Sequence, residues 1–191
     1  MKEYEKYLGL PCFVGWLRRE SFTQIKERVW QHLQGWKQKL LSQAGREVLI
    51  KAVVQAIPAY SMSCFKLPVS LCLEIEVLIK KFWWGYGGNQ KKMHWVNWYK
   101  MCLAKRHSGM GFRNMRKFND SLLAKQVWRL IHNDKSLFCK VFKARFFMHG
   151  SILDDDVKTN GSYAWKSIIQ ARSVSQKRAL WRIGSGNQAK I

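Results

Sequence analysis

The chain has 191 residues, 47% of them hydrophobic, which is enough for one core or two small ones and excludes a disordered chain. Lysine and arginine number 34 against 12 aspartates and glutamates, a formal charge of +22. This excess repels itself unless a polyanion or further protein offsets it, and solubility alone needs a net charge of only about 2–8. Nucleic acid is therefore the leading candidate partner, and a basic surface tuned for solubility is the alternative.

The first part of the chain has hydrophobic residues at helical spacing, after a short extended segment. Ser21 and Gln24 fit a capping box at the start of the first helix, and Pro58 ends the second. Pro68 can stand in the first turn of the third helix, where its missing amide costs nothing. The predicted elements are an extended segment at 7–11 and helices over about 21–34, 42–56 and 68–84.

The apolar face of each predicted helix should turn toward the core. For the first helix this face consists of Phe22, Ile25, Val29 and Leu33, and for the second of Val48, Leu49, Ala52, Val53 and Ala56. Among the tryptophans, core packing is favoured for Trp30, Trp36, Trp128 and Trp165. The patterns around Trp83, Trp84, Trp95 and Trp98 fit core packing and exposed stacking equally well.

The second part of the chain begins with an irregular stretch, 85–111, in which glycines, aromatics and bases follow no period. Asn119 or Asp120 can cap a helix that ends near His132, and Ser136 can begin another that ends near Phe147. A last helix is predicted over about 162–172, and residues 180–191 could form a small hairpin.

The fold class predicted from these elements is mainly α. It comprises a helical bundle at 1–84, a second helical region at 85–153 and a C-terminal extension at 154–191. The stretch 154–161 is the expected joint between the main helical body and the extension.

Catalytic and metal-binding patterns are weak. Asp154, Asp155 and Asp156 resemble the paired aspartates that hold magnesium in polymerases, but such a site needs another carboxylate from a second strand. The upstream acids, Asp120 and Asp134, lie in helical patterns, so a solvated acidic loop is the better interpretation. No phosphate loop or hydrolase motif stands out. We therefore expect no enzyme, catalytic residue, metal, cofactor or small-molecule substrate.

The cysteines are five, an odd number, and they are widely spaced. They predict free thiols in a reducing, intracellular compartment. The longest uncharged run, 52–65, is too short to cross a bilayer, so no membrane partner is expected.

Two stretches mix bases with aromatic residues, which suits phosphate contact beside ring stacking. An ordinary aromatic core is the alternative. The candidate binding residues in these stretches are Lys80, Lys81, Trp83, Trp84, Lys91 and Lys92.

Several motifs also resemble, in order and spacing, the region after the palm in reverse transcriptases of plant LINE-type (non-LTR) retrotransposons. They include Tyr7-Leu8-Gly9-Leu10-Pro11, Trp36-Lys37-x-Lys39-Leu40-Leu41-Ser42-x-x-Gly45-Arg46, Phe82-Trp83-Trp84-Gly85, Gly109-Met110-Gly111-Phe112, Leu122-Leu123-Ala124-Lys125-Gln126-x-Trp128 and Ser162-Tyr163-x-Trp165-Lys166. Together they cover nearly the whole chain.

The resemblance implies a non-catalytic fragment of an RNA-directed DNA polymerase. The palm motifs of the family would lie before Tyr7 and its RNase H-like region after Ile191, so the missing palm is an expected partner. In the family, the helices after the palm act as a thumb that grips the primer-template duplex. By position, a phosphate-contact role falls to Lys37, Lys39, Arg46 and Lys51, with a solvated helix face as the alternative.

One departure from the family is at 102–109, where the family usually has Cys-x-Pro-Lys-x-x-Gly-Gly. Ala104 and Ser108 stand at the positions of the proline and the first glycine. This is consistent with relaxed constraint on a remnant. The alternatives are a host-adopted nucleic-acid-binding protein, for example one acting on organellar RNA, and a genomic remnant without function. A nuclear or a mitochondrial location fits each of them.

Overall fold

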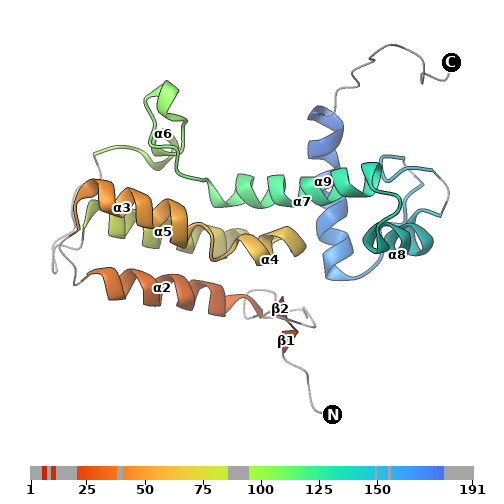
Figure 1. Ribbon diagram of the computed structural model, residues 1–191, viewed down its shortest axis with the longest axis horizontal. Helices are drawn as coiled ribbons and strands as arrows, with labels where there is room; N and C mark the ends of the chain where they lie inside the picture. The colour runs from red at the N-terminus through yellow and green to blue at the C-terminus, as the bar shows by residue number, and fades with distance from the viewer. Residues whose placement is uncertain are drawn as a thin grey trace. The chain divides into compact units, whose positions relative to one another are not determined.

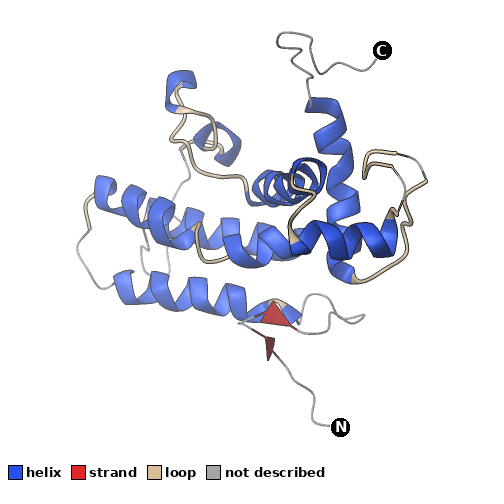
Figure 2. Ribbon diagram, turned by 45° about the vertical axis from the view of Figure 1, so that its right-hand side comes forward, coloured by secondary structure: helices blue, strands red, loops and turns tan. Residues whose placement is uncertain are grey.

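The computed structural model describes residues 6–7, 10–11, 21–37, 41–85, 95–148, 150–154 and 156–178. Within these ranges the chain is mainly helical, which confirms the predicted fold class (Figure 2). The chain divides into two compact units, Met1–Leu123 and Ala124–Ile191. The predicted boundaries after 84 and 153 stay predictions, because compact units need not follow the segments of a parent protein.

In the first unit the chain forms a pair of two-residue strands and then a series of helices (Figure 1). The strands pair in antiparallel register, with Lys6 opposite Pro11 and Tyr7 opposite Leu10. The elements of this unit are β1 (Lys6–Tyr7), β2 (Leu10–Pro11), α2 (Thr23–Lys37), α3 (Gln43–Leu49), the π-helix η1 (Ile50–Val54), α4 (Ala59–Cys64), α5 (Val69–Trp84), α6 (Trp98–Met101), the 3₁₀-helix η2 (Lys105–His107) and the first part of α7 (Met115–His132).

Helix α2 lies beside α5 and runs in the same direction (Figure 1). The ring of Phe22 lies 5.6 Å from that of Phe65, just before α5, and the ring of Trp36 lies 6.1 Å from that of Phe82 near its end. The predicted inner face of α2 is confirmed, since all four of its hydrophobic residues are buried. The predicted third helix is also confirmed as α5.

The predicted helix over 42–56 consists of α3 followed by η1, and its predicted inner face is wrong. Val48 is 62% exposed and Ala52 and Ala56 are exposed, whereas Ile50 and Val54 are buried. Leu49 and Val53 are half-buried. Apolar residues lie nearly all round this helix, and the π-turn shifts the inner face, so periodicity could not decide which side is buried.

Helix α7 begins at Met115, so the prediction that Asn119 or Asp120 caps it is wrong. The start is fixed by two other side chains. Glu76 Oε1 accepts a hydrogen bond from the Met115 amide at 2.9 Å, and Asn114 Oδ1 accepts one from the Lys117 amide at 3.0 Å. Asn119 is buried one turn further into the helix instead.

The Asn119 side chain joins α7 to the segment between α4 and α5. Its Oδ1 accepts a hydrogen bond from the Leu67 amide at 2.8 Å. Its Nδ2 donates to the carbonyl oxygens of Met62 and Phe65, at 2.8 and 2.9 Å. A single buried amide side chain thus bonds three backbone groups at the end of α4 and in the connection to α5.

The second unit contains the rest of α7, α8 (Leu137–Phe146) and α9 (Tyr163–Arg178). The predicted cap of α8 is confirmed, because Ser136 accepts a hydrogen bond from the Cys139 amide at 3.2 Å. The predicted end of the last helix near 172 is too early. Helix α9 continues to Arg178, and Ala171 and Ser175, one turn apart on its buried side, pack into the core.

The core of the second unit surrounds Trp165, which is fully buried. Its ring stacks on Phe146 at 4.2 Å, and its Nε1 donates to the Lys158 carbonyl at 2.7 Å. A Cβ at Gly161 would lie 2.6 Å from Phe146 and 2.8 Å from Trp165, so this glycine lets the rings close. The predicted core role of Trp165 is confirmed.

Other tryptophans differ from the prediction. Trp30 and Trp128 are 50% and 47% exposed, so their predicted core roles are wrong, and Trp36 is half-buried. Trp83 and Trp98 are buried in the first unit, while Trp95 is exposed.

Residues 95–111 contain only the short α6 and η2, as expected for an irregular stretch. The rest of that stretch, 86–94, and the predicted hairpin at 180–191 lie outside the described residues. None of the helices described is long and apolar enough to cross a membrane.

Candidate nucleic-acid interface

Lys51 and Lys105 meet at the carboxylate of Glu47, and Arg46 precedes Glu47 in the sequence; these three bases are called the basic cluster. Ser42 caps α3 by accepting a hydrogen bond from the Gly45 amide at 3.2 Å, and this start places Glu47 one turn before Lys51. Glu47 Oε1 lies 2.6 Å from Lys51 Nζ and 3.1 Å from Lys105 Nζ. Lys105 comes from η2, so two distant segments of the chain meet at one acid.

The Glu47 carboxyl group is held in its charged form by these neighbours. The hydrogen bonds from Lys51 and then Lys105 lower its pKa below the ordinary value of 4.5, against an opposing effect of burial. One negative charge among three positive ones leaves the cluster with two positive charges at neutral pH. The Lys105 side chain is 71% exposed, so part of this charge faces solvent.

Arg46 and Lys51 also have structural contacts. Arg46 Nη1 donates to the Trp83 carbonyl at 3.3 Å, where the end of α5 leaves carbonyl groups without helical partners. Lys51 Nζ lies 5.7 Å from the centre of the Phe112 ring. The predicted phosphate-contact role of these two residues stays a prediction. To contact a phosphate, each side chain would have to keep or give up the contacts described here.

The base-aromatic stretch of α5 splits between core and surface. Trp83 is buried, and its ring meets that of Phe112 edge-on at 5.1 Å, so it offers no face for base stacking in this structure. Lys80 Nζ lies 5.5 Å from the Trp98 ring centre, beside a hollow of about 180 Å³ that Trp84 also lines. Lys81 is exposed.

The remaining predicted site residues cannot be placed in this way. The backbone of Lys37 forms the last residue of α2, but its side chain lies outside what the structure describes. Lys39, Lys91 and Lys92 lie outside the described residues altogether. The sequence interpretation missed Lys105, although this lysine stands in the 102–109 segment whose family pattern includes a lysine.

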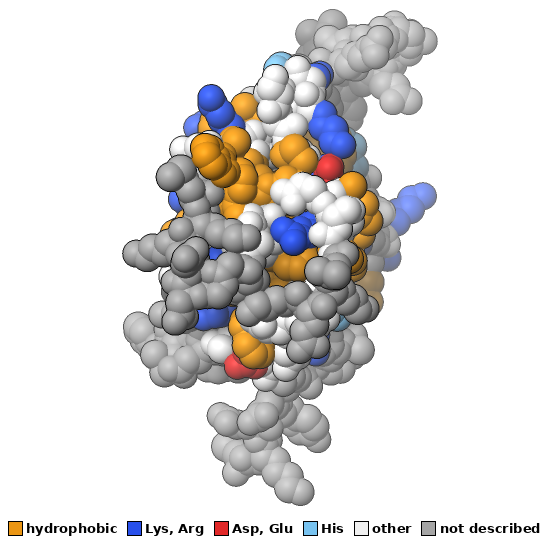
Figure 3. All heavy atoms as spheres, turned by 90° about the vertical axis from the view of Figure 1, so that its left-hand side faces the viewer, with side chains coloured by type: hydrophobic (Ala, Val, Ile, Leu, Met, Phe, Trp, Pro, Cys, Tyr) orange, Lys and Arg blue, Asp and Glu red, His pale blue; other side chains and the backbone are white. Residues whose placement is uncertain are grey.

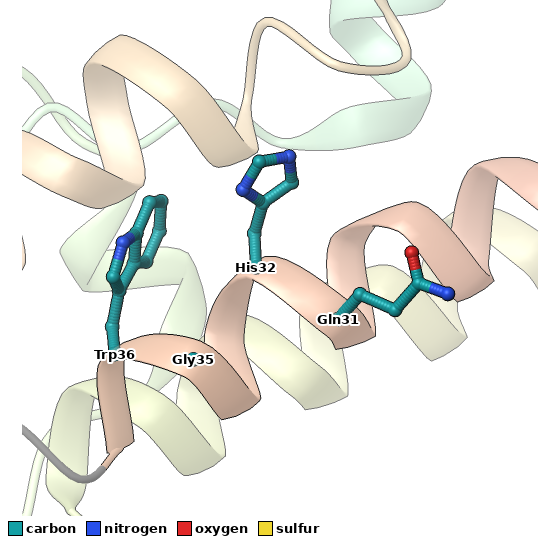
Figure 4. A pocket seen from close by; sticks show the side chains of 4 residues that line it. All are labelled: Gln31, His32, Gly35 and Trp36. Atoms are coloured by element: carbon teal, nitrogen blue, oxygen red, sulfur yellow. The ribbon is translucent and has the colours of Figure 1, made fainter.

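A hollow of about 350 Å³ lies over the last turns of α2. In Figure 4, His32 and Trp36 rise from the same side of the helix, with their rings 5.6 Å apart, and Gly35 bears no side chain between them. One imidazole is too few for a metal site. Over the described residues, no three His, Cys, Asp or Glu side chains come together as a metal site would need.

Lysine and arginine side chains are scattered among hydrophobic ones on the face seen in Figure 3, with little Asp or Glu between them. Several described acids are engaged internally: Glu74 with Lys26, Glu76 with the Met115 amide, and Asp120 with Lys66. On this face the Lys and Arg side chains therefore outnumber the Asp and Glu side chains. Sequence and fold together define the class: a basic, mainly helical protein.

Comparison with known proteins gives the family. The chain is 40% identical over 137 residues to the "Uncharacterized mitochondrial protein AtMg00310" of Arabidopsis thaliana, covering 71% of this chain and 89% of that protein. The chain belongs to the family of this plant mitochondrial protein. It is also 35% identical over 186 residues to the "Putative ribonuclease H protein At1g65750" of the same plant. That match covers 95% of this chain but 30% of the longer relative. No family model matches.

Proposed function

We propose that this chain derives from the segment after the palm of a LINE-type reverse transcriptase and binds nucleic acid through phosphate contacts. The observation that carries the proposal is the basic cluster, in which Lys51 and Lys105 share one carboxylate and Arg46 stands beside it in the sequence, on a chain of net charge +22. Phosphate neutralisation requires positive side chains with freedom to reach a backbone, and the exposed Lys105 provides it. Counterion release on binding would supply the free energy.

The retroelement origin is supported by the motifs and by the longer relative. The resemblance implies an RNase H-like region beyond the segment that this chain matches, and the longer relative is named as a ribonuclease H protein. This chain spans 30% of that relative, so it would correspond to a segment between catalytic regions.

We further propose that the chain has no catalytic activity of its own, since its sequence offers no convincing set of carboxylates for two metal ions. A primer-extension assay with magnesium or manganese tests this. Template-dependent extension that disappears in an Asp154→Asn, Asp155→Asn variant would show that the chain is an enzyme.

Binding is tested by titrating a labelled RNA-DNA hybrid at several salt concentrations. The affinity should fall steeply as salt rises. The double variant Lys51→Ala, Lys105→Ala should reduce the slope of log affinity against log salt by about 2, or about 1 for each lost phosphate contact. This double variant keeps Arg46 and its hydrogen bond to the Trp83 carbonyl at the end of α5.

The matched control is Lys135→Ala, Lys166→Ala, which removes the same charge at two exposed positions of the second unit. If both double variants reduced the slope equally, the basic cluster would have no special part in the interface. An affinity that does not change with salt would overturn the proposal of phosphate contacts.

A host-adopted, free-standing binding protein is the second candidate, for example one that acts on organellar RNA. One observation favours it: this chain covers 89% of a relative that is itself named as a mitochondrial protein. Mass spectrometry of fractionated plant tissue tests it. A protein of this size in one compartment supports adoption, whereas peptides that continue into a palm sequence support a segment of a larger enzyme.

A further inference from the structure

A second basic surface is formed by residues of α6, of the segments next to it and of the start of α7; both helices are labelled in Figure 1. A hollow of about 300 Å³ opens there, and its lining exposes more apolar than polar surface. Its lining includes Tyr99, Leu103, Phe112, Arg113, Lys117 and Phe118. We call this the α6–α7 hollow. It lies entirely within the first compact unit.

The rim of the hollow pairs cations with aromatic rings. Lys117 Nζ lies 5.4 Å from the centre of the Tyr99 ring, and the Arg113 guanidinium lies 4.4 Å from that of Phe118. Tyr99 is 61% exposed, and both cations are exposed. Within the described parts of the chain, neither cation forms an ion pair with a carboxylate. Their charge is therefore available to an anion from solvent.

The backbone amides at the start of α7, unlike the two cations, are not free to bind an anion. The Met115 amide donates to Glu76 and the Lys117 amide to Asn114, so these two groups already have acceptors. The Glu76 carboxylate is buried and bound to that amide. An anion at this surface would be held by the side chains of Arg113 and Lys117.

The floor of the hollow is chemically different from its rim. The Phe112 ring at this floor is buried, and it stacks on the Trp98 ring with the ring centres 5.6 Å apart. An apolar floor, an exposed tyrosine ring and two cations at the rim match a flat ring that carries phosphates on either side. Bases of a duplex are paired and stacked on each other, so an unpaired base fits this description better.

We infer that the α6–α7 hollow binds one unpaired base of a single nucleic-acid strand. Tyr99 stacks on the base, and Arg113 and Lys117 contact the flanking phosphates. This inference rests on the proposed nucleic-acid binding and adds to it the preferred form of the ligand. The basic cluster would contact only the phosphate backbone of the nucleic acid, whereas the α6–α7 hollow would contact the ring of the base.

The first experiment separates the base from the phosphates. The full chain is titrated with a labelled single strand of about twelve nucleotides and with an abasic strand of the same length and charge. Base stacking should make the base-bearing strand bind about tenfold more tightly. Equal affinity for the two strands would overturn the inference, because the bases would then contribute nothing.

The second experiment places the effect in the hollow. Tyr99→Ala should abolish the preference for the base-bearing strand, whereas Tyr60→Ala, at a tyrosine that is 52% exposed on α4, should leave it intact. Arg113→Ala with Lys117→Ala should weaken binding of both strands more than Arg116→Ala with Lys125→Ala, which removes two exposed charges of the same helix outside the hollow.

A preference that Tyr99→Ala leaves unchanged would overturn the inference, even if the salt-dependent binding persisted. If no strand bound in a salt-dependent manner, the proposed function itself would fail, and the inference with it. The two failures are distinguishable because phosphate binding is measured on the abasic strand and base recognition on the ratio between strands.

Discussion

Ser108 has a left-handed backbone conformation, which favours glycine because glycine has no side chain. It has φ 58° and ψ 23° at the end of η2, and among the described residues it is the non-glycine residue with positive φ. The left-handed conformation costs an L-residue about 1–2 kcal/mol. In the family that the motifs resemble, glycine usually stands at this position, so the departure leaves a strained turn rather than a rebuilt one.

Ser108→Gly should therefore stabilise the protein by about 1 kcal/mol, after the greater entropy that glycine gives the unfolded chain is subtracted. Urea unfolding measures the change. Gly109→Ala should act in the opposite direction, because its Cβ would lie 2.1 Å from the Leu103 carbonyl oxygen. An unchanged or lower stability of Ser108→Gly would show that the turn is not strained.

Replacement of Asn119 should change the free energy of unfolding by more than replacement of Ser108. Asn119→Ala would remove three hydrogen bonds, one from the Leu67 amide and two to the carbonyl groups of Met62 and Phe65. Since one unsatisfied buried group costs about 1–3 kcal/mol, a loss of about 3 kcal/mol is expected. Asn133→Ala removes the same amide group at an exposed position and should change the free energy of unfolding by less than about 0.5 kcal/mol. Similar losses in both variants would contradict the linking role of Asn119.

At the residue scale, the sequence predicted packing well where the apolar pattern was one-sided. The buried face of α2 and the burial of Trp165 followed from periodicity. The exposure of Trp30 and Trp128 did not, because a large apolar ring within a helical pattern says nothing about which neighbours cover it. The prediction that Asn119 is a cap was wrong because its hydrogen-bond partners lie 52–57 residues earlier in the chain.

At the scale of elements, the junction of α3 and η2 depends on one carboxylate. The folded pKa of Glu47 is depressed, so its contribution is present above the unfolded value of 4.5 and is lost as pH falls through the folded pKa. The wild type should therefore melt at a higher temperature than Glu47→Gln at pH 6–7, and the difference should vanish in strong acid. A thermal melt series over pH tests this. A difference that persists when the carboxyl group is protonated would assign the effect to packing instead.

The predicted helices were most accurate where local sequence marks both ends. Pro68 begins α5 and Gly85, with φ 81°, ends it, while Ser136 begins α8. The start of α7 could not be predicted in this way. Its first amide is satisfied by Glu76, which lies 39 residues earlier, and no local pattern contains that information. The short α4 was missed because six residues are too few to show a period.

At the scale of the whole molecule, an unbalanced positive charge accompanies exposed apolar side chains. Val69, Leu73 and Val77, spaced one turn apart on α5, are 45%, 47% and 43% exposed. The charge keeps free molecules apart at low salt but also strains the compact state. A polyanion that binds the folded chain relieves this strain.

Heparin should therefore raise the melting temperature through preferential binding to the folded form. The free protein should bind a hydrophobic dye. An uncharged dextran of similar size serves as the control and should leave the melting temperature nearly unchanged. A protein that melts at the same temperature with and without heparin, and binds no dye, would be a self-sufficient domain without the expected polyanion site.

The candidate interface was predictable in its chemistry but less in its location. Charge alone indicated nucleic acid, and the α5 stretch mixed bases with aromatic residues; in the structure Lys80 lies near the ring of Trp98, which is outside that stretch. The basic cluster and the α6–α7 hollow depend on contacts between segments far apart in the sequence. Lys105 reaches Glu47, and Lys117 reaches Tyr99, only after the chain has folded.

The hydrogen bonds of Glu76 and Asn119 bear on the order of events at the ribosome. Each joins α7 to a segment that was synthesised earlier, and none requires a residue after Leu123. The first compact unit can therefore close as soon as Leu123 has left the exit tunnel, while the later residues are still being translated. The surfaces that we propose to bind nucleic acid would then form on the nascent chain, within reach of the RNA-rich ribosome and the message itself.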